Sequence, residues 1–143
     1  MKVDKLTQAY LRKAQVRLEA LHFFKDRQAY SDVVREAQEL VELLLKAVLR
    51  AAGVEVPKIH DVGRVLEKHR EHLPPELTEH LADIRRISKR LRKERELSFY
   101  GAEDFIPTEE YDMEDADLAI ADAAFVYRIV SEIFDKTEAE EPT

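Results

Sequence analysis

The chain contains no cysteine, so neither a disulfide framework nor a thiolate metal site can form. It has only three glycines and five prolines, and this shortage of turn-forming residues favours helices over a sheet. No apolar run approaches the roughly 18 residues that a membrane span needs, and the N-terminus does not resemble a signal segment. We therefore expect an all-α, cytoplasmic protein.

Asparagine is also absent, whereas charged residues make up 37% of the chain. A composition poor in thermolabile residues and rich in potential ion pairs is typical of thermophilic proteins, so we expect a thermophilic source. The formal net charge of −7 is unevenly distributed. Seven bases and one acid lie between Arg85 and Arg95, and eight acids without a base follow Gly101 as far as Asp117. The basic segment is either a phosphate-binding surface or a solvated helix face balanced by neighbouring acids.

Apolar residues recur at the 3.6-residue period of an amphipathic helix in several segments. The predicted helices cover residues 3–25, a segment capped by Ser31 and ended by Gly53, a segment from 62 to before Pro74, residues 76–99, and a segment from the cap Asp112 to about 136. The aperiodic residues 100–111 are predicted to form a loop. We expect one domain, residues 1–136, folded as an antiparallel up-and-down bundle of about five helices, with residues 137–143 as a polar tail.

The apolar stripe of the predicted helix 76–99 changes character near its end, where Arg95 and Ser98 follow Leu91. An arginine on a core-facing stripe needs hydrogen-bonded partners, because an unpaired buried charge costs several kcal/mol. Those partners are a bound phosphate or a carboxylate of the second helix, for which the candidates are Glu36, Glu39 and Glu42. A purely structural ion pair at the helix end is the competing interpretation.

Two stretches carry a resemblance to a known family. Residues 30–53, YSDVVREAQELVELLLKAVLRAAG, precede KIHDV at 58–62, and residues 92–101, RKERELSFYG, precede a loop, Tyr111 and an alanine-rich last helix. In this order, over about residues 5–135, they resemble the HEPN family (higher eukaryotes and prokaryotes nucleotide-binding). The resemblance implies a helical protein that binds RNA or a nucleotide at the Arg95 end of the bundle.

Many HEPN domains look like metal-independent ribonucleases that carry an arginine, a polar residue directly after it and a histidine a few residues further on. Arg95 and Glu96 match the first two positions, but Tyr100 stands where the histidine is expected. A phenol, with an ordinary pKa of about 10, is a poor general base at pH 7. The resemblance thus favours binding by Arg95, Tyr100, Ser98 and Arg92 over cleavage, with Arg95, Glu96 and Tyr100 as the catalytic candidates if the protein is an enzyme.

We expect no cofactor and no metal. His69 and His72 are three residues apart, with His80 beyond them, a spacing that could hold a divalent ion. Because no third ligand is clear, we interpret them as surface histidines. The resemblance implies a homodimer and, as a partner, a minimal nucleotidyltransferase in a toxin–antitoxin-like pair. A ribonuclease with an atypical site and a structural homodimer without ligand are the alternatives. The last helix carries alanines that allow close helix approach, inside the bundle or across a dimer interface, at positions 119, 121, 123 and 124.

Overall fold

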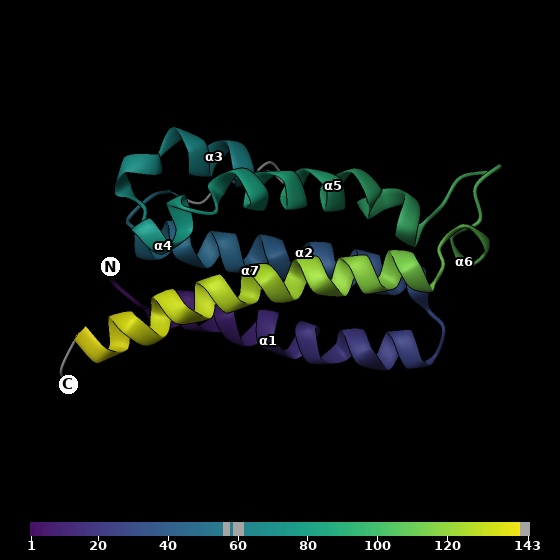
Figure 1. Cartoon of the computed structure of the whole chain (residues 1–143), viewed down its shortest axis with the longest axis horizontal. Coiled ribbons are helices and arrows are strands. Elements are labelled where there is room, and N and C mark those ends of the chain that lie inside the picture. The colour runs from purple at the N-terminus through teal and green to yellow at the C-terminus, as the bar shows by residue number, and fades with distance from the viewer. Residues whose placement is uncertain (56–57, 59–61, 141–143) are drawn as a thin grey trace.

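The computed structural model describes residues 1–55, 58 and 62–140, apart from the side chains of residues 95–97, 139 and 140. Four long helices run up and down in antiparallel order (Figure 1): α1 (Lys5–Asp26), α2 (Tyr30–Ala51), α5 (Leu81–Phe99) and α7 (Met113–Glu140). Shorter helices lie in the connections: α3 (Val62–Lys68), the 3₁₀ helix η1 (Arg70–His72), α4 (Pro75–Thr78) and α6 (Pro107–Glu110). The described residues form no strand, which confirms the predicted all-α bundle. None of their helices is long and apolar enough to span a membrane.

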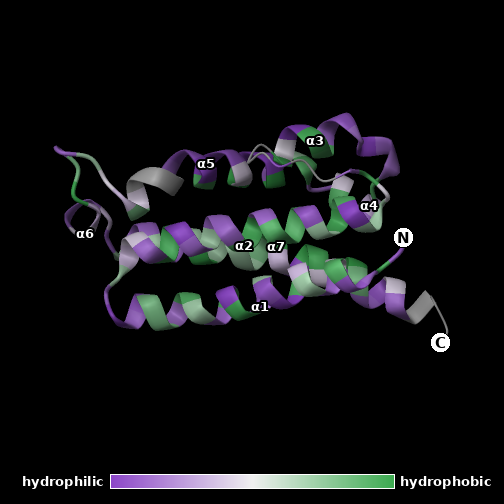
Figure 2. Cartoon of the chain, turned by 180° about the vertical axis from the view of Figure 1, so that it is seen from behind, coloured by the Kyte–Doolittle hydropathy of each residue, from purple (hydrophilic) through white to green (hydrophobic). Residues whose placement is uncertain are grey.

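The centre of the bundle is α2, which packs against α1, α5 and α7. Its buried leucines, among them Leu40 and Leu44, join Leu21 of α1, Ile84 of α5 and Val130 of α7 in one core. Figure 2 shows hydrophobic residues gathered on α2 and α7, whereas hydrophilic residues dominate α5. Each fully buried leucine contributes about 1.5–3 kcal/mol to the stability of the fold, so this core fixes the position of α5.

The C-terminal end of α2 agrees with the sequence prediction, whereas its N-terminal end differs from it. Gly53 has φ 81°, the left-handed conformation predicted for the C-terminal cap. At the start, however, Ala29 is the N-cap residue, and Ser31 is buried in the first turn without a side-chain capping bond. The chain reverses at Gln28, with φ 60°, so the helix begins directly after that turn and before the predicted cap.

The prediction of one continuous helix over residues 76–99 was wrong in one respect, because two separate helices, α4 and α5, cover this range. Pro75 occupies the first turn of α4, and the hydroxyl of Thr78 donates to the Pro75 carbonyl oxygen over 3.2 Å. The short α4 packs against α7, while α5 packs against α2 and α3. These different packing partners require a change of direction that the continuous apolar pattern from Leu77 to Leu81 does not reveal.

The predicted loop 100–111 contains one helical turn, α6, which begins at Pro107. Gly101, at φ 71°, makes the preceding tight turn, where a Cβ atom would lie 2.6 Å from the carbonyl oxygen of Phe105. The predicted cap Asp112 starts α7, where it forms a capping box with Asp115. The amide of Asp115 donates to Asp112 Oδ1 over 3.0 Å, and the amide of Asp112 donates to Asp115 Oδ2 over 2.9 Å.

The last helix extends to Glu140, beyond the predicted end near residue 136. Lys136 Nζ lies 2.8 Å from Glu76 Oε1 of α4, which ties the final turns to the bundle. Of the four alanines predicted to allow close approach, Ala119 and Ala123 are buried inside the bundle. Ala121 and Ala124 are exposed on the outer face of α7.

Candidate functional site

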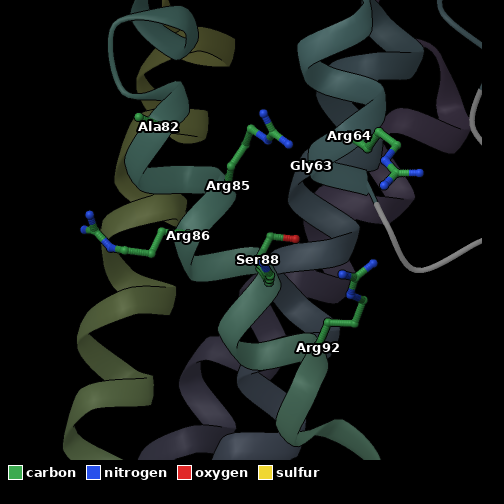
Figure 3. Close-up of a pocket in the computed structure, with 8 residues that line it drawn as sticks. Gly63, Arg64, Ala82, Arg85, Arg86, Ser88 and Arg92 are labelled. Carbon is green, nitrogen blue, oxygen red and sulfur yellow. The ribbon is translucent and has the colours of Figure 1, made fainter.

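A groove lies between α3 and α5, on the flank of α5 that faces away from α7. It encloses about 480 Å³ and is lined by Gly63, Arg64, Ala82, Arg85, Arg86, Ser88, Lys89 and Arg92. We call it the basic groove, because its lining includes four arginines and a lysine but no acid. Figure 3 shows Arg85, Ser88 and Arg92 pointing from α5 toward α3, whereas Arg86 points away.

The helix α3 approaches α5 at Gly63. This glycine is buried, and a Cβ atom added to it would lie 3.5 Å from Cγ and 3.7 Å from Cα of Arg85. Its neighbours Val62 and Leu66 are buried in the core and anchor the short helix. An alanine side chain at this position would therefore be in ordinary van der Waals contact with Arg85.

The ion pairs of Arg85 and Arg86 compensate their charges only weakly. Arg85 Nη1 lies 3.7 Å from Glu67 Oε2, and Arg86 Nη2 lies 2.8 Å from Asp83 Oδ1, but all four side chains are exposed. Exposed pairs of this kind are worth only about 0–1 kcal/mol. Arg64 and Arg92 have interactions of their own, while Lys89 has no ion-pair partner among the described residues. A phosphate entering the groove can therefore compete for most of these cations.

Ser88, Lys89 and Arg92 reach this groove from the basic segment noted in the sequence. Arg92 was among the predicted binding residues, and Arg85 and Lys89 were recognised only as part of a charged face. Arg64 was missed, since it comes from α3, far away in the sequence. The available signal was Gly63 inside a short helix, because an interior glycine costs about 1 kcal/mol and often marks a close approach.

Arg95 and Glu96 lie in the last part of α5, but their side chains are outside the described part of the structure, so their roles stay predictions. Ser98 and Tyr100 are described and have opposite environments. Ser98 is 1% exposed, inside the bundle, whereas Tyr100 is 74% exposed. Of the predicted binding residues whose side chains are described, Arg92 lines the basic groove, Tyr100 is exposed and Ser98 is buried.

The three carboxylates proposed as partners for Arg95 have other cationic neighbours on α1 and α2. Glu36 lies 3.5 Å from Arg17 Nε, and Glu39 lies 3.4 Å from Arg35 Nε. Glu42 accepts hydrogen bonds from Gln38 and from Lys46, over 2.9 and 2.8 Å. Burial raises the pKa of Glu36, against the opposing charge of Arg17. Glu39 and Glu42 have further interactions as well, so a pair with Arg95 remains an open prediction.

The described histidines do not gather at the groove. His80 packs edge-on against Phe125, with the ring centroids 5.6 Å apart, and His69 and His72 lie near each other at 6.4 Å. None of the described histidines lines the basic groove. His60 lies outside the described residues. Within the described residues, no group of three His, Asp or Glu side chains could hold a metal ion.

The opposite flank of α5 holds a second cavity, of about 290 Å³, between α5, α6 and α7. Four carboxylates contribute to its lining, from Glu94, Glu110, Asp115 and Asp122. Arg90 donates to Asp122, and the Tyr111 hydroxyl donates to Glu94 over 2.6 Å. Burial and this hydrogen bond raise the pKa of Tyr111. We call it the acidic cavity; its charge makes it unsuited to phosphate.

Comparison with known families adds a match that covers most of the chain. A model of the HEPN domain matches residues 7–133, which include nearly all of α1, all of α2, α3 and α5, and α7 as far as residue 133. Comparisons with curated proteins and with solved structures returned no match. HEPN membership supports a function related to nucleotides or RNA in general. On the strength of the match over residues 7–133, this chain belongs to the HEPN domain family.

Proposed function

We propose that this HEPN protein binds RNA or a nucleotide through the basic groove, acting in the cytoplasm. The observation that carries the proposal is the gathering of five cations from two helices around one groove of about 480 Å³. Arg95 follows Arg92 by three residues along α5, so the predicted arginine belongs to the same end of the site. The site therefore extends from α3 along α5 toward the Arg95 end of the bundle.

The chemistry of the groove suits phosphate oxygens. Arginine presents a planar fork of donors that matches phosphate, and Lys89 supplies a compact positive charge. Arg64 approaches from α3 and Arg85 from α5, so a phosphate between the helices can meet cations on both sides (Figure 3). The acidic cavity on the other flank of α5 repels a polyanion and steers it to the basic groove.

Salt-dependent RNA binding tests the proposal. We would titrate a fluorescent single-stranded RNA with the protein at about 50 and 200 mM salt, because phosphate contacts release counterions and weaken as salt rises. Replacing Lys89 with Glu should weaken binding about tenfold or more and reduce the salt slope by about one contact or more. Lys13→Glu is the matched control, because Lys13 is exposed on α1 and the charge change is the same.

Two results would contradict this proposal. Equal losses in Lys89→Glu and Lys13→Glu would mean that net charge alone governs binding, without a defined site. Binding by the unmodified protein that does not respond to salt would remove phosphate contact as its basis. ATP and short oligonucleotides, compared by thermal shift, distinguish a nucleotide ligand from an RNA strand, since a ligand of the folded state raises the melting temperature.

Metal-independent RNA cleavage is the alternative, with Arg95, Glu96 and Tyr100 as its candidates. Binding is favoured because none of the described histidines lines the groove, and a tyrosine is a poor general base near neutral pH. An RNA-degradation assay in the presence of a chelator decides between the two. We expect little cleavage by the unmodified protein, and rapid cleavage that Arg95→Ala abolishes would establish the enzyme instead.

Partners complete the proposal. We propose a homodimer that works with a minimal nucleotidyltransferase in a toxin–antitoxin-like pair, as the family resemblance implies. The exposed face of α7, with Leu118, Ala121 and Ala124, allows a second helix to approach closely. Sedimentation at tens of micromolar should give a dimer, and a monomer alone would leave a single-chain protein. A structural dimer without ligand would show no thermal shift with any nucleotide or RNA.

A further inference from the structure

Two aromatic side chains stand exposed at the end of α5. Phe99 is 51% exposed and Tyr100 is 74% exposed. Their rings meet edge to face, with centroids 4.8 Å apart. The guanidinium of Arg35, on α2, lies 4.7 Å from the Phe99 ring centroid, an arrangement that holds the ring through a cation–π contact. The end of α5 thus offers aromatic surface to solvent on a side chain that is held in place.

Phe99, the last residue of α5, continues the line of the basic groove, and Tyr100 follows directly after the helix. Phe99 follows Arg92 by seven residues and Arg85 by fourteen. Residues seven apart in an α-helix lie on nearly the same face, with a drift of only about 20° per heptad. At 1.5 Å per residue, Arg92 and Phe99 are about 10 Å apart along the axis. A ligand that follows this face of α5 therefore passes from cations to an aromatic surface.

A single nucleic-acid strand is the ligand that fits both features. Its phosphates attract cations, and its unstacked bases can stack on aromatic rings whatever their sequence. In a duplex the bases are stacked inside the helix, so only the phosphates are available to the groove. A free phosphate or a single nucleotide could bind in the groove but would not reach both the cations and the aromatic rings.

We propose that Phe99 and Tyr100 form a base-stacking subsite for single-stranded RNA whose phosphates lie in the basic groove. This inference rests on the proposed function and adds the class of strand. Tyr100 supplies the stacking surface, and Phe99 supports it under Arg35. Phosphate contact alone would let the protein bind any nucleic acid, whereas stacking makes it prefer an unpaired strand.

The experiment compares a fluorescein-labelled oligoadenylate of about ten nucleotides with a duplex of the same length. Tyr100→Ala should weaken oligoadenylate binding about tenfold, and Tyr100→Phe, which keeps the aromatic ring, should restore most of the affinity. Phe23→Ala is the matched control, because Phe23 is 59% exposed on α1 and also has an arginine, Arg27, 5.3 Å from its ring centroid. A 2-aminopurine base in the strand should lose fluorescence when it stacks, and Tyr100→Ala should restore it.

Each outcome either supports or overturns the subsite. If Tyr100→Ala weakens binding of the single strand and of the duplex equally, or weakens neither, there is no stacking subsite. Salt-dependent binding of RNA would still leave the proposed function intact. If the unmodified protein binds no RNA, both proposals fall. If Tyr100→Ala instead changes the oligomeric state in sedimentation, the aromatic pair is a protein contact. Circular dichroism of each variant verifies that the bundle is folded.

Discussion

The two flanks of α5 differ in how their charges are used, although one short stretch of sequence supplies both. On the flank toward α3, Arg85 and Lys89 lie in an open groove whose ion pairs are exposed and weak. On the flank toward α7, Arg90 is bound to the buried Asp122, and Glu94 accepts a hydrogen bond from Tyr111. A count of charges along the chain gives these residues equal weight, but Arg90 is bound to Asp122, whereas Lys89 has no ion-pair partner among the described residues.

The reason is the position of each residue around the helix. Successive residues on α5 are about 100° apart, so Lys89 and Arg90 project toward different neighbours. The helix α3 brings a further arginine to one flank, whereas α7 brings carboxylates to the other. A binding surface and a structural polar network can therefore share one segment.

The largest effect is expected for Leu91, a core residue of α5 between the two flanks, and it should appear in the free energy of unfolding. Leu91 is buried beneath α5, and Leu91→Ala should lower the free energy of unfolding by about 2–5 kcal/mol through lost burial and the remaining cavity. Chemical denaturation measures this change. Leu118→Ala, at a half-exposed leucine of α7, should change stability by less than about 0.5 kcal/mol. Similar losses in both variants would mean that α5 is not seated by its apolar stripe.

Removing the predicted arginine should affect binding next most strongly. Arg95→Ala should weaken RNA binding by about 1–3 kcal/mol, the usual scale for losing a charged hydrogen bond. Binding titrations at two salt concentrations measure the loss. Arg128→Ala is the control, because Arg128 is exposed on α7, beyond the acidic cavity. Unchanged binding in Arg95→Ala would remove Arg95 from the binding site.

Substitutions at the acidic cavity should change the stability of the fold rather than the affinity for RNA. Tyr111→Phe removes the hydrogen bond to Glu94 and should cost about 1 kcal/mol of unfolding free energy at pH 7. Because the folded state raises the pKa of Tyr111, this phenol stabilises the fold below its ordinary pKa of about 10 and loses that contribution at higher pH. The penalty should therefore shrink above pH 10, as denaturation at several pH values would show. A loss of RNA affinity in Tyr111→Phe would contradict the separation of the flanks.

The smallest effect is expected at the contact between α3 and α5. Gly63→Ala should stabilise the protein by about 0.5 kcal/mol, because its Cβ would make ordinary contacts with Arg85 and alanine favours helix. Gly63→Leu should instead extend into the space beside Arg85 and weaken RNA binding. Thermal unfolding and binding titrations on both variants test this, and equal RNA affinity in the two would show that the ligand does not enter the groove at Gly63.

The sequence predicted the bundle well because apolar periodicity reports directly on which helix faces are buried. The centre at α2, the cap at Gly53 and the capping box of Asp112 and Asp115 all follow from local patterns. The break before α5 could not be read from the sequence, since Leu77 and Leu81 keep helical spacing while their helices pack on different partners. Tertiary packing decided that boundary.

The candidate site was predicted less completely. Arg92 was identified, but the contribution of Arg64 depends on how α3 packs against α5, which no local pattern encodes. Tyr100 was identified for its hydroxyl, whereas its exposure and its contact with Phe99 point to its ring. Exposure and ring contacts depend on the path of the chain after α5, and Gly101 sets that path through a turn whose form is visible only in three dimensions.

We propose that RNA contacts the α3-facing flank of α5 and avoids the α7-facing flank. Backbone amide chemical shifts of the ¹⁵N-labelled protein, followed during titration with a single-stranded RNA, test it most directly. We predict that the largest shifts arise at Gly63, Arg64 and residues 85–92, with smaller changes around the acidic cavity. The largest shifts at residues 105–122, or uniform shifts over the whole surface, would contradict it.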